Sequence, residues 1–143
     1  MRALLFPARE YHPKLVDIEY TVAKDPDGTI QHRIDFAPWM TPGARPKSYP
    51  ITRHNYDGPY LGRSLMMFIN DNFYNDQSPL NRTITLMVPD DLCWRDNILV
   101  VGAREPLAKY AQYYNATEND IAPTIQYLVG YGKMAREMES QYE

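Results

Sequence analysis

The feature that most constrains this fold is a pair of alternating segments on either side of a turn sequence. In residues 16–22 and 30–36, apolar side chains occupy every second position and polar side chains lie between them. A period of two predicts strands with one buried face each. The intervening Asp25-Pro26-Asp27-Gly28 suits a turn, because proline fixes φ and glycine accepts the left-handed conformation. The sequence therefore predicts a β-hairpin.

The predicted register of this hairpin places Val22 opposite Ile30 and Tyr20 opposite His32. In this alignment two acidic side chains also face each other across the outer surface, which is unfavourable. On the apolar face, we expect the hydroxyl of Tyr20 to form a hydrogen bond with the imidazole of His32. Such a pair is the ordinary role of a histidine in a half-buried strand, and a general base there would need further catalytic groups nearby.

Three further strands are predicted from short apolar segments. Residues 3–6 form an edge strand that ends at Pro7. Residues 83–88 alternate, and residues 98–101 are a continuous apolar run that is typical of a central strand. The link between the last two is too short for a crossover helix, so we expect them to pair antiparallel.

Helices are predicted where apolar side chains recur at helical spacing. The predicted ranges are 59–74, 106–115, and a third helix that begins near Asp120 after a Thr117–Asp120 capping pattern. The order of elements predicts an α+β fold, with about three helices on one face of a mostly antiparallel sheet. That sheet would consist of the N-terminal hairpin and the second strand pair. No linker divides the 143 residues, so residues 1–143 are expected to form a single domain.

Residues 37–59 are predicted to form a long, proline-rich, basic loop. Five of the 12 prolines fall in this segment, and neither structural period continues through it. Long irregular loops in small domains are often functional. Most of the candidate binding residues are cationic or aromatic side chains in or just after this segment. One further candidate is a tyrosine that is expected to be exposed on the second predicted helix. They are Trp39, Arg45, Lys47, Tyr49, Arg53, His54, Tyr56, Arg63 and Tyr113.

This set of side chains is compatible with more than one role. Tyrosine, tryptophan and arginine dominate protein–protein interfaces, which favours a protein partner. The same groups can stack on bases and pair with phosphate, so a nucleotide, phosphate ligand or nucleic acid is an alternative, with residues 39–63 as a lid. A third interpretation is purely structural, with the aromatic rings packed back onto the sheet or the domain acting in oligomerisation.

The sequence contains no recognisable catalytic, metal-binding or cofactor-binding motif. His12, His32 and His54 lack metal-ligand spacing, and three nearby aspartates disfavour a nucleophilic thiolate at Cys93. No phosphate-binding glycine loop is present, and Asp90 follows its predicted strand without the further carboxylate and lysine of a metal nuclease. We therefore expect no catalytic residues, no metal and no cofactor.

Composition limits where such a protein acts. The formal net charge of −3 argues against a general DNA-coating protein. A single cysteine cannot form an internal disulfide framework. No apolar run is long enough to span a membrane, and the stretch before Pro7 is too short for a secretory signal. These features predict a cytoplasmic protein without a membrane partner.

Together these features predict a small non-enzymatic intracellular protein that engages and modulates a larger protein. This profile is typical of accessory inhibitors such as those carried by phages or plasmids. The residues match no family motif, and the sequence does not indicate an oligomeric state.

Overall fold

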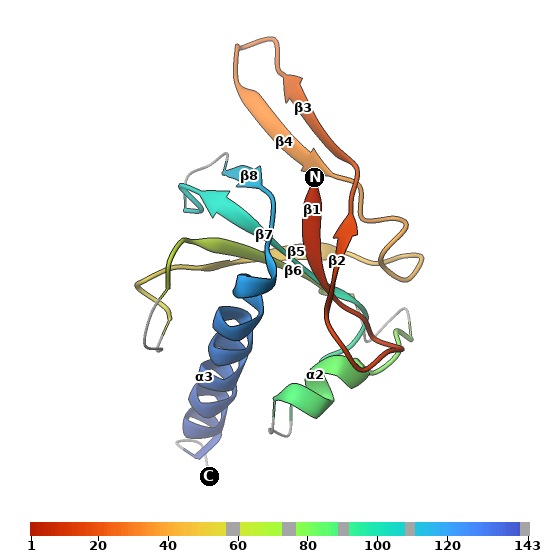
Figure 1. Cartoon of the computed structure of the whole chain (residues 1–143), viewed down its shortest axis with the longest axis vertical. Coiled ribbons are helices and arrows are strands. Elements are labelled where there is room, and N and C mark those ends of the chain that lie inside the picture. Colours follow the sequence, from red (N-terminus) through yellow and green to blue (C-terminus); the bar gives the residue numbers. More distant parts are fainter. Residues whose placement is uncertain (57–60, 73–76, 89–91, 108–110, 141–143) are drawn as a thin grey trace.

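An antiparallel six-stranded sheet forms the body of the computed structural model (Figure 1). Its strands are β1 (Arg2–Phe6), β2 (Lys14–Asp17), β5 (Pro46–Ile51), β6 (Leu65–Asn70), β7 (Ile98–Arg104) and β8 (Gln112–Tyr114). They lie in the order β2-β1-β7-β6-β5, and β8 pairs with β7 beyond the end of β1. The structure describes residues 1–56, 61–72, 77–88, 92–107 and 111–140.

The central strands are apolar throughout because the sheet is covered on both faces. All six residues of β6 are buried, and its alternate side chains enter two different apolar clusters. Leu65, Met67 and Ile69 belong to one cluster, whereas Met66 and Phe68 belong to the other. Strands buried on both faces show continuous apolar runs instead of alternation.

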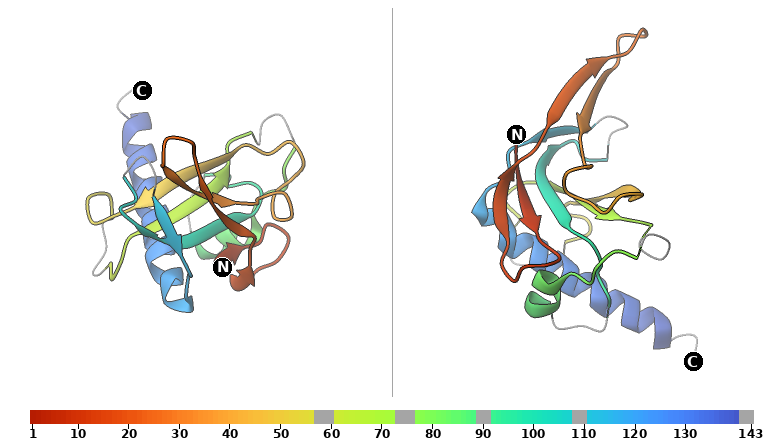
Figure 2. Two further views of the ribbon diagram at one scale, coloured as in Figure 1. Left: turned by 90° about the horizontal axis from the view of Figure 1, so that it is seen from above. Right: turned by 90° about the vertical axis from the view of Figure 1, so that its right-hand side faces the viewer.

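Helices cover the first face. Helix α2 (Arg82–Met87) contributes Ile84 to the cluster there, and the long helix α3 (Ile121–Ser140) contributes Leu128. The short 3-10 helix η1 (Glu118–Asp120) precedes α3. Figure 2 shows α3 running beneath the sheet and extending past its edge.

A two-stranded hairpin and the segment after it cover part of the second face. Strands β3 (Tyr20–Lys24) and β4 (Ile30–Ile34) pair only with each other among the described strands. The hairpin projects away from the body, as both Figure 1 and the right-hand view of Figure 2 show. At its base, Ile34 and Phe36 pack against the second apolar cluster, which includes the buried Met40. We refer to residues 19–35 as the arm.

The predicted arrangement of three helices on the sheet is wrong. Residues 65–70 form strand β6 instead of a helix, and residues 112–114 form β8. Conversely, residues 82–87 form helix α2 instead of a strand. The errors arise because short apolar runs fit both periods: residues four apart share a face in a helix and in a strand.

Two predicted strand positions also need correction. Strand β1 is not an edge strand, since it lies between β2 and β7 and its Leu4 and Phe6 are fully buried. Residues 37–59 are not one continuous loop, because β5 occupies Pro46–Ile51. As the last strand of the sheet, β5 can contain two prolines, since an edge strand has backbone groups without a neighbouring strand.

The predicted hairpin is confirmed, with a shifted register. Tyr20 lies opposite Ile34 and Val22 opposite His32. The shift follows from the turn, in which the Gly28 N–H donates to the Asp25 carbonyl at 2.9 Å and Gly28 has a φ of 88°. Lys24 is thus paired with Ile30, and residues 25–29 lie between them, whereas the predicted register paired Ile30 with Val22. The predicted strand at 98–101 and the start of α3 after the Thr117–Asp120 capping box are confirmed as well.

Candidate functional site

The predicted binding residues do not form one surface. They are divided among four depressions and the exposed edge of the sheet at β5. Arg53, His54 and Arg63 line one depression together, whereas Trp39, Tyr49 and Tyr113 each line a different one. Arg45 and Lys47 are exposed on the edge of the sheet, and Tyr56 packs against the first apolar cluster.

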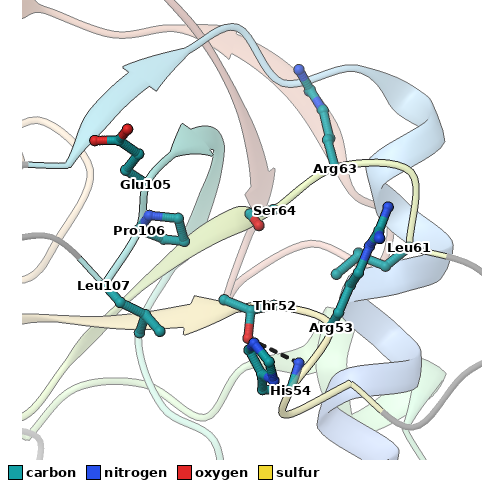
Figure 3. A pocket seen from close by; sticks show the side chains of 9 residues that line it. All are labelled: Thr52, Arg53, His54, Leu61, Arg63, Ser64, Glu105, Pro106 and Leu107. Carbon is teal, nitrogen blue, oxygen red and sulfur yellow. Dashed lines mark hydrogen bonds between the residues drawn. The ribbon is translucent and has the colours of Figure 1, made fainter.

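The depression that collects three predicted residues has a volume of about 510 Å³ (Figure 3). It lies where β5 ends, β6 begins and β7 ends, and Glu105 and Leu107 form its opposite wall. The backbone N–H of His54 donates to the Thr52 hydroxyl at 3.2 Å, which fixes the turn that carries the imidazole. Arg53 and His54 are exposed, so this is an open, polar hollow.

Arg63 is already engaged within the protein. Its Nη2 lies 2.6 Å from the Asp120 carboxylate, and its guanidinium stacks on the Tyr114 ring at 4.6 Å from the ring centre. Burial opposes the charge of Arg63, but the hydrogen bond and charge of Asp120 raise its pKa. Asp120 pairs with Arg63 and so neutralises one cation of the depression, and Glu105 adds a negative charge. The depression is therefore poorly suited to phosphate. The geometry therefore does not favour the nucleotide interpretation.

The arm has one apolar face and one polar face. Tyr20, Val22, Ile30, His32 and Ile34 share a face, because residues two apart along a strand point the same way, and Lys24 ends this face at the tip, opposite Ile30. Toward the tip this face is uncovered: Val22 is 57% exposed and Ile30 is 50% exposed. Large apolar side chains that lie together on a projecting ribbon are typical of contact surfaces.

The base of the arm is anchored to the sheet by aromatic contacts. The Tyr113 ring, on β8, meets Phe68 edge-on at 5.6 Å and His32 at 6.4 Å between centres. Tyr20 and His32 stack, and the predicted hydrogen bond between the Tyr20 hydroxyl and His32 Nδ1 is confirmed. Burial raises the pKa of Tyr113, which is half-buried here and not exposed as predicted.

Charge is unevenly distributed around the arm. Residues 19–35 contain four acidic and two basic side chains, a formal net charge of −2 with His32 neutral. At the tip, hydrogen bonds from the side chain and backbone of Thr29 lower the pKa of Asp27, which keeps this carboxylate ionised. The arm therefore presents an apolar strip bordered by negative charge.

Within the described residues, no cluster of His, Cys, Asp and Glu side chains could hold a metal ion, and no helix is long and apolar enough to cross a membrane. Asp57, the acid closest to His54 in the sequence, lies outside the described residues. No protein-family model matches this chain, and neither a curated protein nor a solved structure matches it significantly.

The sequence predicts the hairpin but not the exposure of its apolar tip. The signal was present: Val22 and Ile30 extend the apolar alternation almost to the turn, beyond the length that the sheet can cover. The candidate site thus moves from residues 39–63 to the arm, with Tyr113 as the predicted residue that lies at its base.

Proposed function

We propose that this protein is a non-enzymatic, intracellular accessory protein that engages and modulates a larger protein through the apolar face of its arm. The observation that carries the proposal is the exposure of Val22 and Ile30, diagonal neighbours on one face of a ribbon that projects from the body. A two-stranded ribbon has little stability by itself, so apolar side chains exposed near its tip are better explained by binding than by folding. The single cysteine suits a reducing intracellular compartment.

The chemistry of the arm favours a different protein over a second copy of this chain. Two copies joined face to face through their arms would bring together segments of net charge −2, which repel each other. A partner with an apolar groove bordered by lysine or arginine complements both the apolar strip and the surrounding carboxylates. Such a partner would bind faster at low salt than at high salt.

The test compares two single variants that place the same charge on opposite faces of one strand. Val22→Asp puts a carboxylate on the apolar face, and the neighbouring Thr21→Asp puts one on the polar face. Each variant is immobilised beside the wild type and incubated with lysate of the source cells, and bound proteins are quantified by mass spectrometry. We expect one partner to bind the wild type and Thr21→Asp equally, and Val22→Asp at least tenfold less.

Two outcomes would overturn the proposal. If no protein distinguishes Val22→Asp from Thr21→Asp, the arm is not the binding surface. If light scattering shows a wild-type dimer that Val22→Asp dissociates, the arm serves self-association instead. Circular dichroism of each variant checks that the hairpin and sheet are retained, so that a loss of binding reports on the surface.

A further inference from the structure

A second cavity lies on the helix-covered face of the sheet, away from the arm. Its volume is about 590 Å³, within the range of about 300–1,000 Å³ that is typical of small-molecule sites. Met67 and Ile69 of β6 contribute its apolar floor, and residues 92–95 and helix α3 provide further walls. Nothing in the proposed arm function uses this cavity.

Aromatic rings from three parts of the chain line the cavity. Tyr49 comes from β5, Trp94 from the segment before β7, and Tyr127 and Tyr131 from adjacent turns of α3. The last two are four residues apart and therefore lie on the same face of the helix. Trp94 and Tyr131 are in contact, with ring centres 5.5 Å apart and planes inclined at 58°. Rings arranged in this way offer stacking and edge contacts to a flat molecule.

The rings carry polar groups that can donate hydrogen bonds: the tyrosine hydroxyls, which can also accept, and the indole N–H, which can only donate. Burial raises the pKa of Tyr127, and its neighbours Tyr131 and Tyr49 raise it further, so the hydroxyl remains protonated at neutral pH. The indole nitrogen of Trp94 is buried and has no hydrogen-bond partner. An indole N–H can only donate, and a buried unpaired donor is costly, so this group is an unused donor within the wall formed by Trp94.

Charges near the cavity favour an anionic acceptor. Arg95 lines the cavity, and its Nη1 donates to the Ser78 carbonyl at 2.9 Å, which holds the guanidinium in place. Lys47 lies 5.2 Å from the centre of the Tyr49 ring, and interactions with Tyr49 and then with Asp71 raise its pKa. Asp71 is the acidic residue of the lining, so the lining holds one cation and one carboxylate, and Lys47 adds a second cation beside the Tyr49 ring.

We propose that this cavity binds a planar aromatic molecule that carries an acidic hydrogen-bond acceptor, such as an aromatic carboxylate. The rings of Tyr49, Trp94 and Tyr131 contact its flat surface, and Met67 and Ile69 contact its edge. The acceptor pairs with donors of the cavity, and Lys47 and Arg95 provide long-range attraction for its charge. The cavity thus adds a small-molecule site to a protein whose arm contacts another protein.

The probe for the test is 2-naphthoate, with 2-naphthylmethylammonium as a cation of similar shape. Binding is measured by titration calorimetry and by the fluorescence of Trp94 in a Trp39→Phe background, which removes the chain's other tryptophan. We expect one 2-naphthoate per chain, quenching of Trp94, and at least tenfold weaker binding of the ammonium compound. Absence of saturable 2-naphthoate binding, or tighter binding of the cation, would overturn the proposal.

Matched tyrosine variants assign the binding to this cavity. Tyr127 and Tyr113 are both half-buried, both have a raised pKa, and lie on opposite faces of the sheet. Loss of one hydrogen bond should weaken 2-naphthoate binding about fivefold in Tyr127→Phe and leave it unchanged in Tyr113→Phe. Tyr131→Ala removes a ring of the wall and should weaken it further. Equal affinities in all three variants would place the probe elsewhere and contradict the assignment.

Discussion

The two faces of the six-stranded sheet are covered in different ways. On one face, α2 and α3 bury the first apolar cluster, and Leu128 is fully buried there. On the other, the base of the arm and the segment after it cover the second cluster, while the apolar tip of the arm remains in solvent. The helical face therefore buries its apolar side chains around a cavity, whereas the arm face buries some of its apolar side chains and leaves others in solvent.

The largest expected effect is on the helical face. Leu128→Ala removes a fully buried side chain from the first cluster and leaves a void that α3 cannot close completely. We expect the free energy of unfolding to fall by about 2–5 kcal/mol, measured by urea denaturation. A loss below 1 kcal/mol would mean that α3 is only loosely attached, and would remove the contrast between the two faces.

A second substitution tests the junction between the faces. A Cβ at Gly102 would lie 2.5 Å from the ring of Tyr114 and 2.9 Å from Arg63. Gly102→Ala must therefore displace the ring on which Arg63 stacks, and we expect a loss of about 1–3 kcal/mol in the free energy of unfolding. Ala103→Gly, at the next position of β7, serves as a comparison that introduces no overlap. Wild-type stability of Gly102→Ala would show that Tyr114 and Arg63 are not fixed against β7.

Alkaline pH should destabilise both faces. Burial raises the pKa of Tyr113 and of Tyr127 above the value of an exposed tyrosine, so the native state holds these protons more tightly than the unfolded state. The resulting stability is complete below about pH 10, and is lost as the pH rises through the native pKa. In Tyr113→Phe and in Tyr127→Phe, the free energy of unfolding should fall less steeply above pH 10 than it does in the wild type. Urea denaturation at a series of pH values measures this fall. If the free energy of unfolding falls equally steeply in the variants and in the wild type, the hydroxyls of Tyr113 and Tyr127 are hydrated.

The smallest expected effect on stability is at the tip of the arm. Val22→Thr keeps the branched shape and the strand preference of a side chain that is mostly exposed. We expect a change within about 0.5 kcal/mol in the free energy of unfolding, measured beside Leu128→Ala. A loss of 2 kcal/mol or more would show that the tip is packed in the monomer, and would remove the argument for a partner.

Local turn and capping signals predicted the structure well. The Asp25–Gly28 turn and the Thr117–Asp120 capping box depend on a few neighbouring residues, and both are found at the predicted positions. The hydrogen bond between Tyr20 and His32 was also predicted, because residues on one face of a hairpin remain close after a shift of register.

Elements whose identity depends on distant contacts were predicted poorly. Leu65–Asn70 is a strand because β5 and β7 pair with it on both sides, which its own apolar run cannot reveal. In α2, Ile84 is buried whereas Leu86 is 64% exposed, although both lie on the same side of an alternating pattern. Asn81 decides the outcome there, since its side chain accepts the Ile84 N–H at 2.8 Å and starts a helix.

The candidate site was only partly predictable for the same reason. Arg63 appeared to be an available cation because its partner Asp120 is 57 residues away in the sequence. Likewise, the rings that line the second cavity come from β5, the segment before β7 and α3, which only the tertiary structure brings together. The exposure of the arm's tip could not be predicted, because it depends on how far the sheet extends.

The most direct test of the central claim is site-specific photo-crosslinking along β3. A photoreactive phenylalanine analogue replaces Val22 in one protein and Thr21 in another, and both are irradiated in cells of the source organism. We predict a single crosslinked product of defined mass from position 22, containing a different protein, and none from position 21. Equal products from both positions, none from position 22, or a product that contains only this chain would contradict the claim that the apolar face of the arm binds a protein partner.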